Sequence, residues 1–62
     1  MVTKFEILRR GAGLTQAQLA EKTGVTRQTI SRIENGEIGN VSVKTLAKCA
    51  EAIGCNITEF FV

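Results

Sequence analysis

Residues 14–36 read LTQAQLAEKTGVTRQTISRIENG, and this stretch decides the fold. Within it, residues 16–23 and 27–35 carry apolar side chains at the spacing of an amphipathic helix. Only residues 24–26 (GVT) separate the two segments. A turn this short fixes two helices at a steep angle, and its glycine supplies a left-handed backbone conformation that other residues resist. The stretch therefore predicts two helices held in a fixed relative orientation.

A local pattern marks where four helices begin. A residue with a side-chain oxygen follows an apolar residue directly and stands four positions before another, at Thr15, Thr26, Ser42 and Asn56. Such an oxygen accepts a hydrogen bond from a free amide in the first helical turn, and the two apolar residues pack together as a hydrophobic staple. Gln18 and Glu59 stand three residues after two of these caps, so we expect them to complete capping boxes.

An amphipathic segment before the first cap adds one more helix, so the chain is predicted to be all-α with five short helices. These helices are expected at residues 3–10, 16–23, 27–35, 43–53 and 57–61. The residues expected to face the core are Phe5, Leu8, Ala17, Leu19, Ala20, Val25, Ile30, Ile33, Val43, Leu46, Ala47, Ala50, Ile53 and Phe60. No segment alternates like a strand, and residues 1–62 are predicted to form a single domain.

Composition excludes several functional classes. The 62 residues include no histidine and suggest no pair of catalytic carboxylates, so an enzyme is the least favoured class. Cys49 and Cys55 have no further cysteine or histidine with which to bind zinc, so we expect free thiols in a reducing compartment, without a metal or cofactor. No signal peptide and no apolar run of about 18 residues is present, which predicts a cytoplasmic protein without a membrane partner. At a length of 62 residues we expect no second domain for a small-molecule ligand.

The segment 27–35 has one apolar face and one polar face. At about 100° per residue, Ile30 and Ile33 fall opposite the polar side chains. The net charge of +2 is uninformative by itself, but an ordinary solvated helix face would be richer in Glu and Lys. The side chains on this face suit DNA binding instead, because arginine pairs with guanine and glutamine pairs with adenine through two hydrogen bonds each. The residues expected to contact base edges in the major groove are Arg27, Gln28, Ser31 and Arg32.

The stretch 14–36 closely resembles the Xre/Cro family of phage repressors and bacterial regulators. Residues 42–46 (SVKTL) and 54–61 (GCNITEFF) look like the fourth and fifth helices of the same family, so the resemblance covers the chain from Phe5 onward. It implies a lambda-repressor-like helix-turn-helix fold and double-stranded DNA as the partner. The phosphate contacts that it implies are Gln16, Thr26, Asn35 and Lys44. At Gln16, the free amides and dipole of a helix start also favour an anion.

The resemblance also implies an ion pair between Arg9 of the first helix and Glu34 at the end of the third. Such a pair would orient the helix that reads the DNA. One segment departs from the family pattern, because residues 37–41 (EIGNV) contain an acidic residue and no basic one. We therefore expect few phosphate contacts from this loop and a modest affinity at physiological salt.

These features predict a sequence-specific DNA-binding transcriptional regulator, most simply a repressor. One unit of 62 residues reaches about one half-site, so we expect a homodimer on a palindromic operator. Phe61 and Val62 are candidates for the dimer contact, although both could instead cap the core. Two alternatives stay open: the DNA-binding antitoxin of a toxin–antitoxin pair, and a protein-interaction module that has lost DNA binding. The polar, positive face of residues 27–35 argues against the second.

Overall fold

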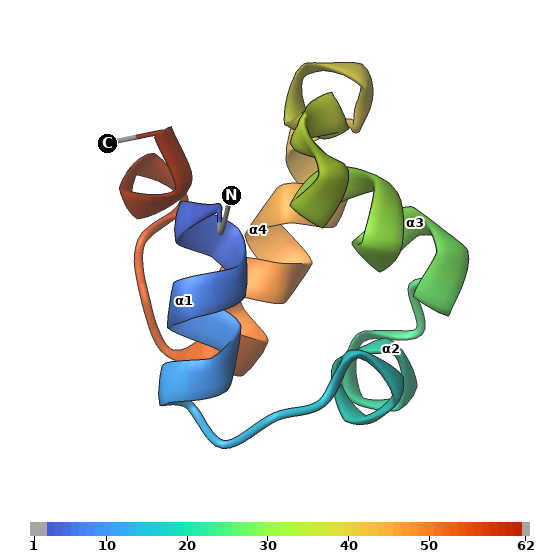
Figure 1. Ribbon diagram of the computed structural model, residues 1–62, viewed down its shortest axis with the longest axis vertical. Helices are drawn as coiled ribbons and strands as arrows, with labels where there is room; N and C mark the ends of the chain where they lie inside the picture. Colours follow the sequence, from blue (N-terminus) through green and yellow to red (C-terminus); the bar gives the residue numbers. More distant parts are fainter. Residues whose placement is uncertain (1–2, 62) are drawn as a thin grey trace.

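A computed structural model describes residues 3–61, which form four α-helices and three shorter helical turns (Figure 1). The α-helices are α1 (Lys4–Gly11), α2 (Gln16–Thr23), α3 (Arg27–Arg32) and α4 (Val43–Ile53). The turns are the π-helical η1 (Ile33–Glu37), which continues α3, and the 3-10 turns η2 (Ile38–Asn40) and η3 (Ile57–Phe61). These residues contain no strand, which confirms the all-α prediction. The fifth predicted helix is a 3-10 turn rather than an α-helix.

Side-chain caps begin the helices largely as the sequence predicts. Thr15 Oγ1 accepts from the Gln18 N–H at 3.1 Å and Gln18 Oε1 accepts from the Thr15 N–H at 2.9 Å, which completes the first capping box. The Thr26 and Ser42 side chains cap α3 and α4. The fourth cap is only half formed: the Asn56 N–H donates to Glu59 Oε2 at 2.9 Å. The Glu59 N–H instead donates to the backbone oxygen of Asn56, because η3 is a 3-10 turn.

Three helix boundaries differ from the predicted ones, and one of them is the end of α1, which runs to Gly11 rather than to Arg10. Thr3 caps α1 by accepting from the Glu6 N–H at 3.3 Å, so the helix begins at Lys4 rather than at Thr3. The α-helical turns of α3 widen into a π turn at Ile33, before the predicted end of that helix. Gly36, with φ of 94°, then kinks the chain in a conformation that suits glycine.

The predicted staples hold the core together. The second member of each apolar pair is buried, at Leu19, Ile30, Leu46 and Phe60. The first member of each pair is partly buried and packs against this core, at Leu14, Val25, Val41 and Cys55. The caps therefore fix where each helix starts, and the staples direct its apolar side inward.

The two ends of the described chain meet in the core. The rings of Phe5 in α1 and Phe60 in η3 pack with centroids 4.8 Å apart at an interplanar angle of 50°. Cys49 of α4 is fully buried, and this burial raises the pKa of its thiol to about 11, so the thiol is neutral at physiological pH. Cys55 is also a free thiol but is only partly buried.

Three residues predicted to face the core are instead exposed. Ala17 lies two residues before the buried Leu19, which turns it about 160° away around α2. Ala47 follows the buried Leu46 and therefore points about 100° away from it. Val43 shares its helical face with buried residues, but it is the first residue of α4 and is 72% exposed at the edge of the core.

Candidate nucleic-acid interface

Hydrogen bonds at Thr23, Gly24 and Val25 hold the short turn between α2 and α3. Gly24 has φ of 77°, and its N–H donates to the Ala20 carbonyl at 2.9 Å. The hydroxyl of Thr23 accepts from the Val25 N–H at 3.2 Å and donates to the Leu19 carbonyl at 2.7 Å. Figure 1 shows α2 nearly end-on and α3 running across the view, so the two helices cross steeply. The turn fixes the direction in which α3 leaves α2.

The helix α3 presents a polar face to the outside. Ile30 and the adjoining Ile33 are buried, which points the opposite side of the helix away from the core. Arg27, Gln28 and Arg32 are exposed, as the helical wheel predicts. Ser31 is half-buried, so its hydroxyl is the least accessible of the four side chains expected to reach base edges.

Arg9 and Glu34 form a buried ion pair with two hydrogen bonds. Arg9 Nε donates to Glu34 Oε2 at 2.6 Å, and Arg9 Nη2 donates to Glu34 Oε1 at 3.1 Å. Arg9 Nη1 also donates to the Leu14 carbonyl at 2.7 Å. The hydrogen bonds that Arg9 donates to Glu34 hold the pKa of Arg9 above its usual value, against the opposing effect of burial. Arg9 therefore stays charged, and its contacts tie α1, the loop before α2 and the end of the α3–η1 segment together.

The residues expected to contact phosphates lie in three parts of the fold. Gln16 is the first residue of α2 and is half-buried, and its Nε2 donates to Glu34 Oε1 at 3.1 Å. Thr26 caps α3, so its hydroxyl already accepts from the Thr29 N–H at 3.2 Å. Asn35 is exposed in η1, and Lys44 is exposed in the first turn of α4. The contact between Gln16 and Glu34 is one that the sequence did not indicate.

A hollow of about 450 Å³ lies beside the start of α2. It brings together three arginines from two helices, Arg9 and Arg10 of α1 and Arg27 of α3. The other residues that line it are Gly13, Leu14, Thr15, Gln16 and Ala17. Arg10 is 70% exposed at its side chain and is paired with Glu6 one turn earlier at 3.0 Å. Sequence reasoning missed Arg10, because only the tertiary fold places the end of α1, the start of α2 and Arg27 around one hollow.

A model of the helix-turn-helix family matches residues 5–60. The chain belongs to this Xre/Cro-like helix-turn-helix family. Members of the family are DNA-binding transcriptional regulators rather than enzymes. Within residues 3–61, no three His, Cys, Asp or Glu side chains cluster as a metal site, and no helix has the length and apolarity to cross a bilayer.

The relatives differ in how much of their length the chain spans. An HTH-type transcriptional regulator of Methanocaldococcus jannaschii is 40% identical over 62 residues, which cover all of this chain and 92% of the relative. A protein of Mycobacterium tuberculosis named as antitoxin HigA2 is 43% identical over 47 residues, which cover 76% of this chain and 46% of the relative. The regulator PuuR of Escherichia coli is 35% identical over 54 residues, 87% of this chain and 29% of the relative. No solved structure matches the chain.

An ion pair lies on the exposed face of the segment formed by α3 and η1. Arg32 Nη2 lies 3.8 Å from Glu37 Oε1, and both side chains are about half exposed, at 51% and 47%. An exposed pair of this kind is worth less than about 1 kcal/mol. Glu37 therefore holds Arg32 only weakly, although it places a negative charge beside the exposed face of α3.

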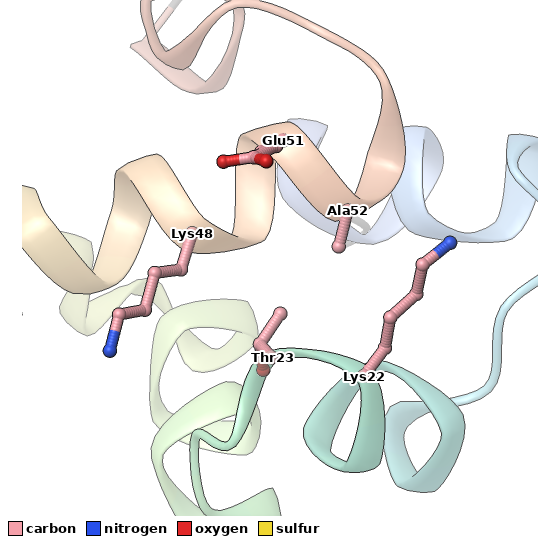
Figure 2. A pocket seen from close by; sticks show the side chains of 5 residues that line it. All are labelled: Lys22, Thr23, Lys48, Glu51 and Ala52. Carbon is pink, nitrogen blue, oxygen red and sulfur yellow. The ribbon is translucent and has the colours of Figure 1, made fainter.

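A second hollow, of about 350 Å³, lies between the end of α2 and α4 (Figure 2). Its lining residues are Lys22, Thr23, Lys48, Glu51 and Ala52. The ammonium groups of Lys22 and Lys48 point away from each other, and the Glu51 carboxylate lies on the same helix as Lys48 (Figure 2). The hollow thus has no concentrated charge, and none of the residues expected to contact DNA lines it.

Proposed function

We propose that this chain is a sequence-specific transcriptional repressor that binds a palindromic operator as a homodimer, with α3 in the major groove. The observation that carries the proposal is the outer face of α3, where Arg27, Gln28 and Arg32 are exposed over a helix whose other side is buried. The short turn fixes this helix at one end, and the Arg9–Glu34 pair fixes its continuation at the other.

The chemistry of these side chains suits base recognition. An arginine donates two parallel hydrogen bonds to O6 and N7 of guanine, and a glutamine donates to and accepts from adenine in the same plane. Arg27 and Gln28 are the first two residues of α3, and the N-terminal residues of a recognition helix meet the base edges. Arg32 lies one turn further along and reaches either a base or the flanking phosphate. Ser31 completes the set that we propose to contact bases.

Phosphate contacts would set the position of the protein on the DNA. Lys44 projects from the first turn of α4, and Gln16 opens α2 beside the hollow that three arginines line. Thr26 and Asn35 stand at the start of α3 and in η1, on either side of the base-reading residues. Such contacts are independent of sequence, and the charged one, at Lys44, is expected to weaken as the salt concentration rises.

Selection of bound sequences from a random DNA pool tests the proposal. The enriched sequences should contain two inverted half-sites whose centres are about 34–36 Å apart, or a multiple of one helical turn, as a symmetric dimer requires. A pool without enrichment would contradict sequence-specific binding. Enrichment of a single asymmetric site would contradict the homodimer alone.

Phe61 supports the assignment of the dimer contact. Its side chain is 59% exposed, whereas the neighbouring Phe60 is 6% exposed in the core. Val62, the other residue predicted at this contact, lies outside the described residues. We expect Phe61→Ser to leave the fold intact and to convert the two-copy complex on operator DNA to one copy, measured by sedimentation. The matched control is Ile7→Ser, at another exposed apolar side chain (53%) on α1. An unchanged complex with Phe61→Ser would rule out this interface.

The similarity to HigA2 favours a second candidate, a DNA-binding antitoxin. This role would use the same face of α3 and would add a toxin protein as a partner. Deletion of the gene separates the two functions. Loss of a repressor changes transcript levels alone, whereas loss of an antitoxin also arrests growth because the toxin is released.

A further inference from the structure

The last arginine of α3 lies beside a carboxylate that comes from outside this helix. Arg32 Nη2 is 3.8 Å from Glu37 Oε1, and α3 itself contains no acidic residue. Five positions along an unbroken α-helix correspond to a rotation of about 140°, so the two side chains would then point apart. The π turn η1 and the kink at Gly36 come between them, and the Glu37 carboxylate returns to the guanidinium. The fold thus makes a contact that a regular helix would not make.

The pair does not use the hydrogen-bond donors of Arg32. A separation of 3.8 Å is too long for a hydrogen bond, so the two groups interact through their charges. This separation is well inside the Debye length of about 8 Å at physiological ionic strength, so salt does not abolish the interaction. A guanidinium has five N–H donors in one plane. Arg32 can therefore bind a further acceptor while Glu37 stays beside it.

The charge of that further acceptor decides how strongly Glu37 acts on it. The O6 and N7 atoms of guanine are neutral and accept two hydrogen bonds from an arginine. A phosphate is an anion, so the Glu37 carboxylate repels it and also cancels part of the attraction that Arg32 exerts. Asn35, a proposed phosphate contact, precedes Glu37 by only two residues, so the DNA backbone would pass near this carboxylate. Glu37 thus disfavours a phosphate contact of Arg32 more than a base contact.

We infer that Glu37 is a positioning residue, which acts through Arg32 to favour a base over a phosphate and thereby lowers binding to non-operator DNA. The inference rests on the proposed function and deepens it, because that function allows Arg32 either contact. On DNA without the matching base, Arg32 would otherwise bind a phosphate and hold the protein at any sequence. Glu37 weakens this alternative, although it contacts no base itself. The ratio of affinities for matched and mismatched DNA is therefore the quantity that tests the inference.

The experiment measures the binding of Glu37→Gln to a selected operator and to a mismatched duplex at several salt concentrations. The glutamine keeps the shape of the side chain and removes its charge. Binding to the mismatched duplex should strengthen by about threefold to fivefold, within the range of one exposed ion pair. Binding to the operator should strengthen by less than about twofold, because the base acceptors are neutral. The log–log salt slope on the mismatched duplex should steepen by about one unit, because Arg32 then contacts a phosphate.

Two further variants separate this role from a general effect of charge. The matched control is Glu51→Gln, which removes the same charge from an exposed side chain of α4, beside the hollow that no proposed DNA contact lines. Each substitution raises the net charge of +2 by one, so the general attraction to DNA changes alike. The affinity ratio of Glu51→Gln should equal that of the parent chain. In an Arg32→Ala background, Glu37→Gln should no longer change the ratio.

The possible outcomes distinguish the inference from the function on which it rests. An equal gain on both duplexes would overturn the positioning role, because Glu37 would then repel all DNA alike while α3 still reads the bases. An unchanged affinity for the mismatched duplex, or an effect on the ratio that persists without Arg32, would overturn it as well. If the parent chain does not distinguish the duplexes, the proposed function itself fails and the inference falls with it. Glu37 is half exposed, so its variant should fold, and thermal unfolding of each variant checks this.

Discussion

Replacement of Glu34 by alanine should lower the free energy of unfolding by about 3 kcal/mol or more. The Arg9 side chain is 8% exposed, and without Glu34 its guanidinium would keep its charge in the core with only the Leu14 carbonyl as a partner. Removal of one partner from a buried pair costs more than the pair itself contributes, because the remaining charge is left without compensation. Urea unfolding of the variant and the parent chain measures the effect.

The control for this prediction is the double variant. Arg9→Ala together with Glu34→Ala removes both charges, so it should be less destabilised than the sum of the two single variants by about 1 kcal/mol or more. Glu34→Gln keeps an acceptor for Arg9 and should lie between Glu34→Ala and the parent chain. Additive single effects would show that the pair does not anchor the α3–η1 segment.

The helix positions could be predicted because their signals are local. A cap at Thr15 or Ser42 depends on amides within one helical turn. The two apolar residues of the staple beside it are only five positions apart in the sequence. Burial depends instead on the neighbours that the fold supplies, so helical spacing alone could not show that Val43 is exposed. Nor could it show that η3 is a 3-10 turn, because the capping pattern before an α-helix and before a 3-10 turn is the same.

In the candidate site, too, the features that depend on local sequence could be predicted, and those that depend on tertiary packing could not. The outward direction of Arg27 and Arg32 follows from periodicity within one helix, and the structure agrees with it. The pairing of Arg9 with Glu34 was implied only by the family resemblance, because the two residues are 25 positions apart and no local pattern connects them. The contact of Gln16 with Glu34 and the hollow beside Arg10 had no signal in the sequence, since both depend on how α1, α2 and η1 pack.

Arg27→Ala should weaken binding to the selected operator by about 1–3 kcal/mol and relax the preference at one position of each half-site. The reason is that Arg27 is exposed at the first residue of α3, where its guanidinium can make paired hydrogen bonds to a guanine edge. Its stability should change little, because the side chain lies outside the core. Lys44→Ala is the control: it should weaken all sequences alike and reduce the dependence on salt by about one unit in the log–log slope.

The most direct test of base reading by α3 is the affinity of Arg27→Ala and the parent chain for matched and mismatched duplexes over a series of salt concentrations. The predicted result is a large loss on the matched duplex and a small loss on the mismatched one, so that the variant discriminates less at every salt concentration. An equal loss on both duplexes would mean that Arg27 supplies only charge, and it would contradict the assignment of α3 as the helix that reads the DNA.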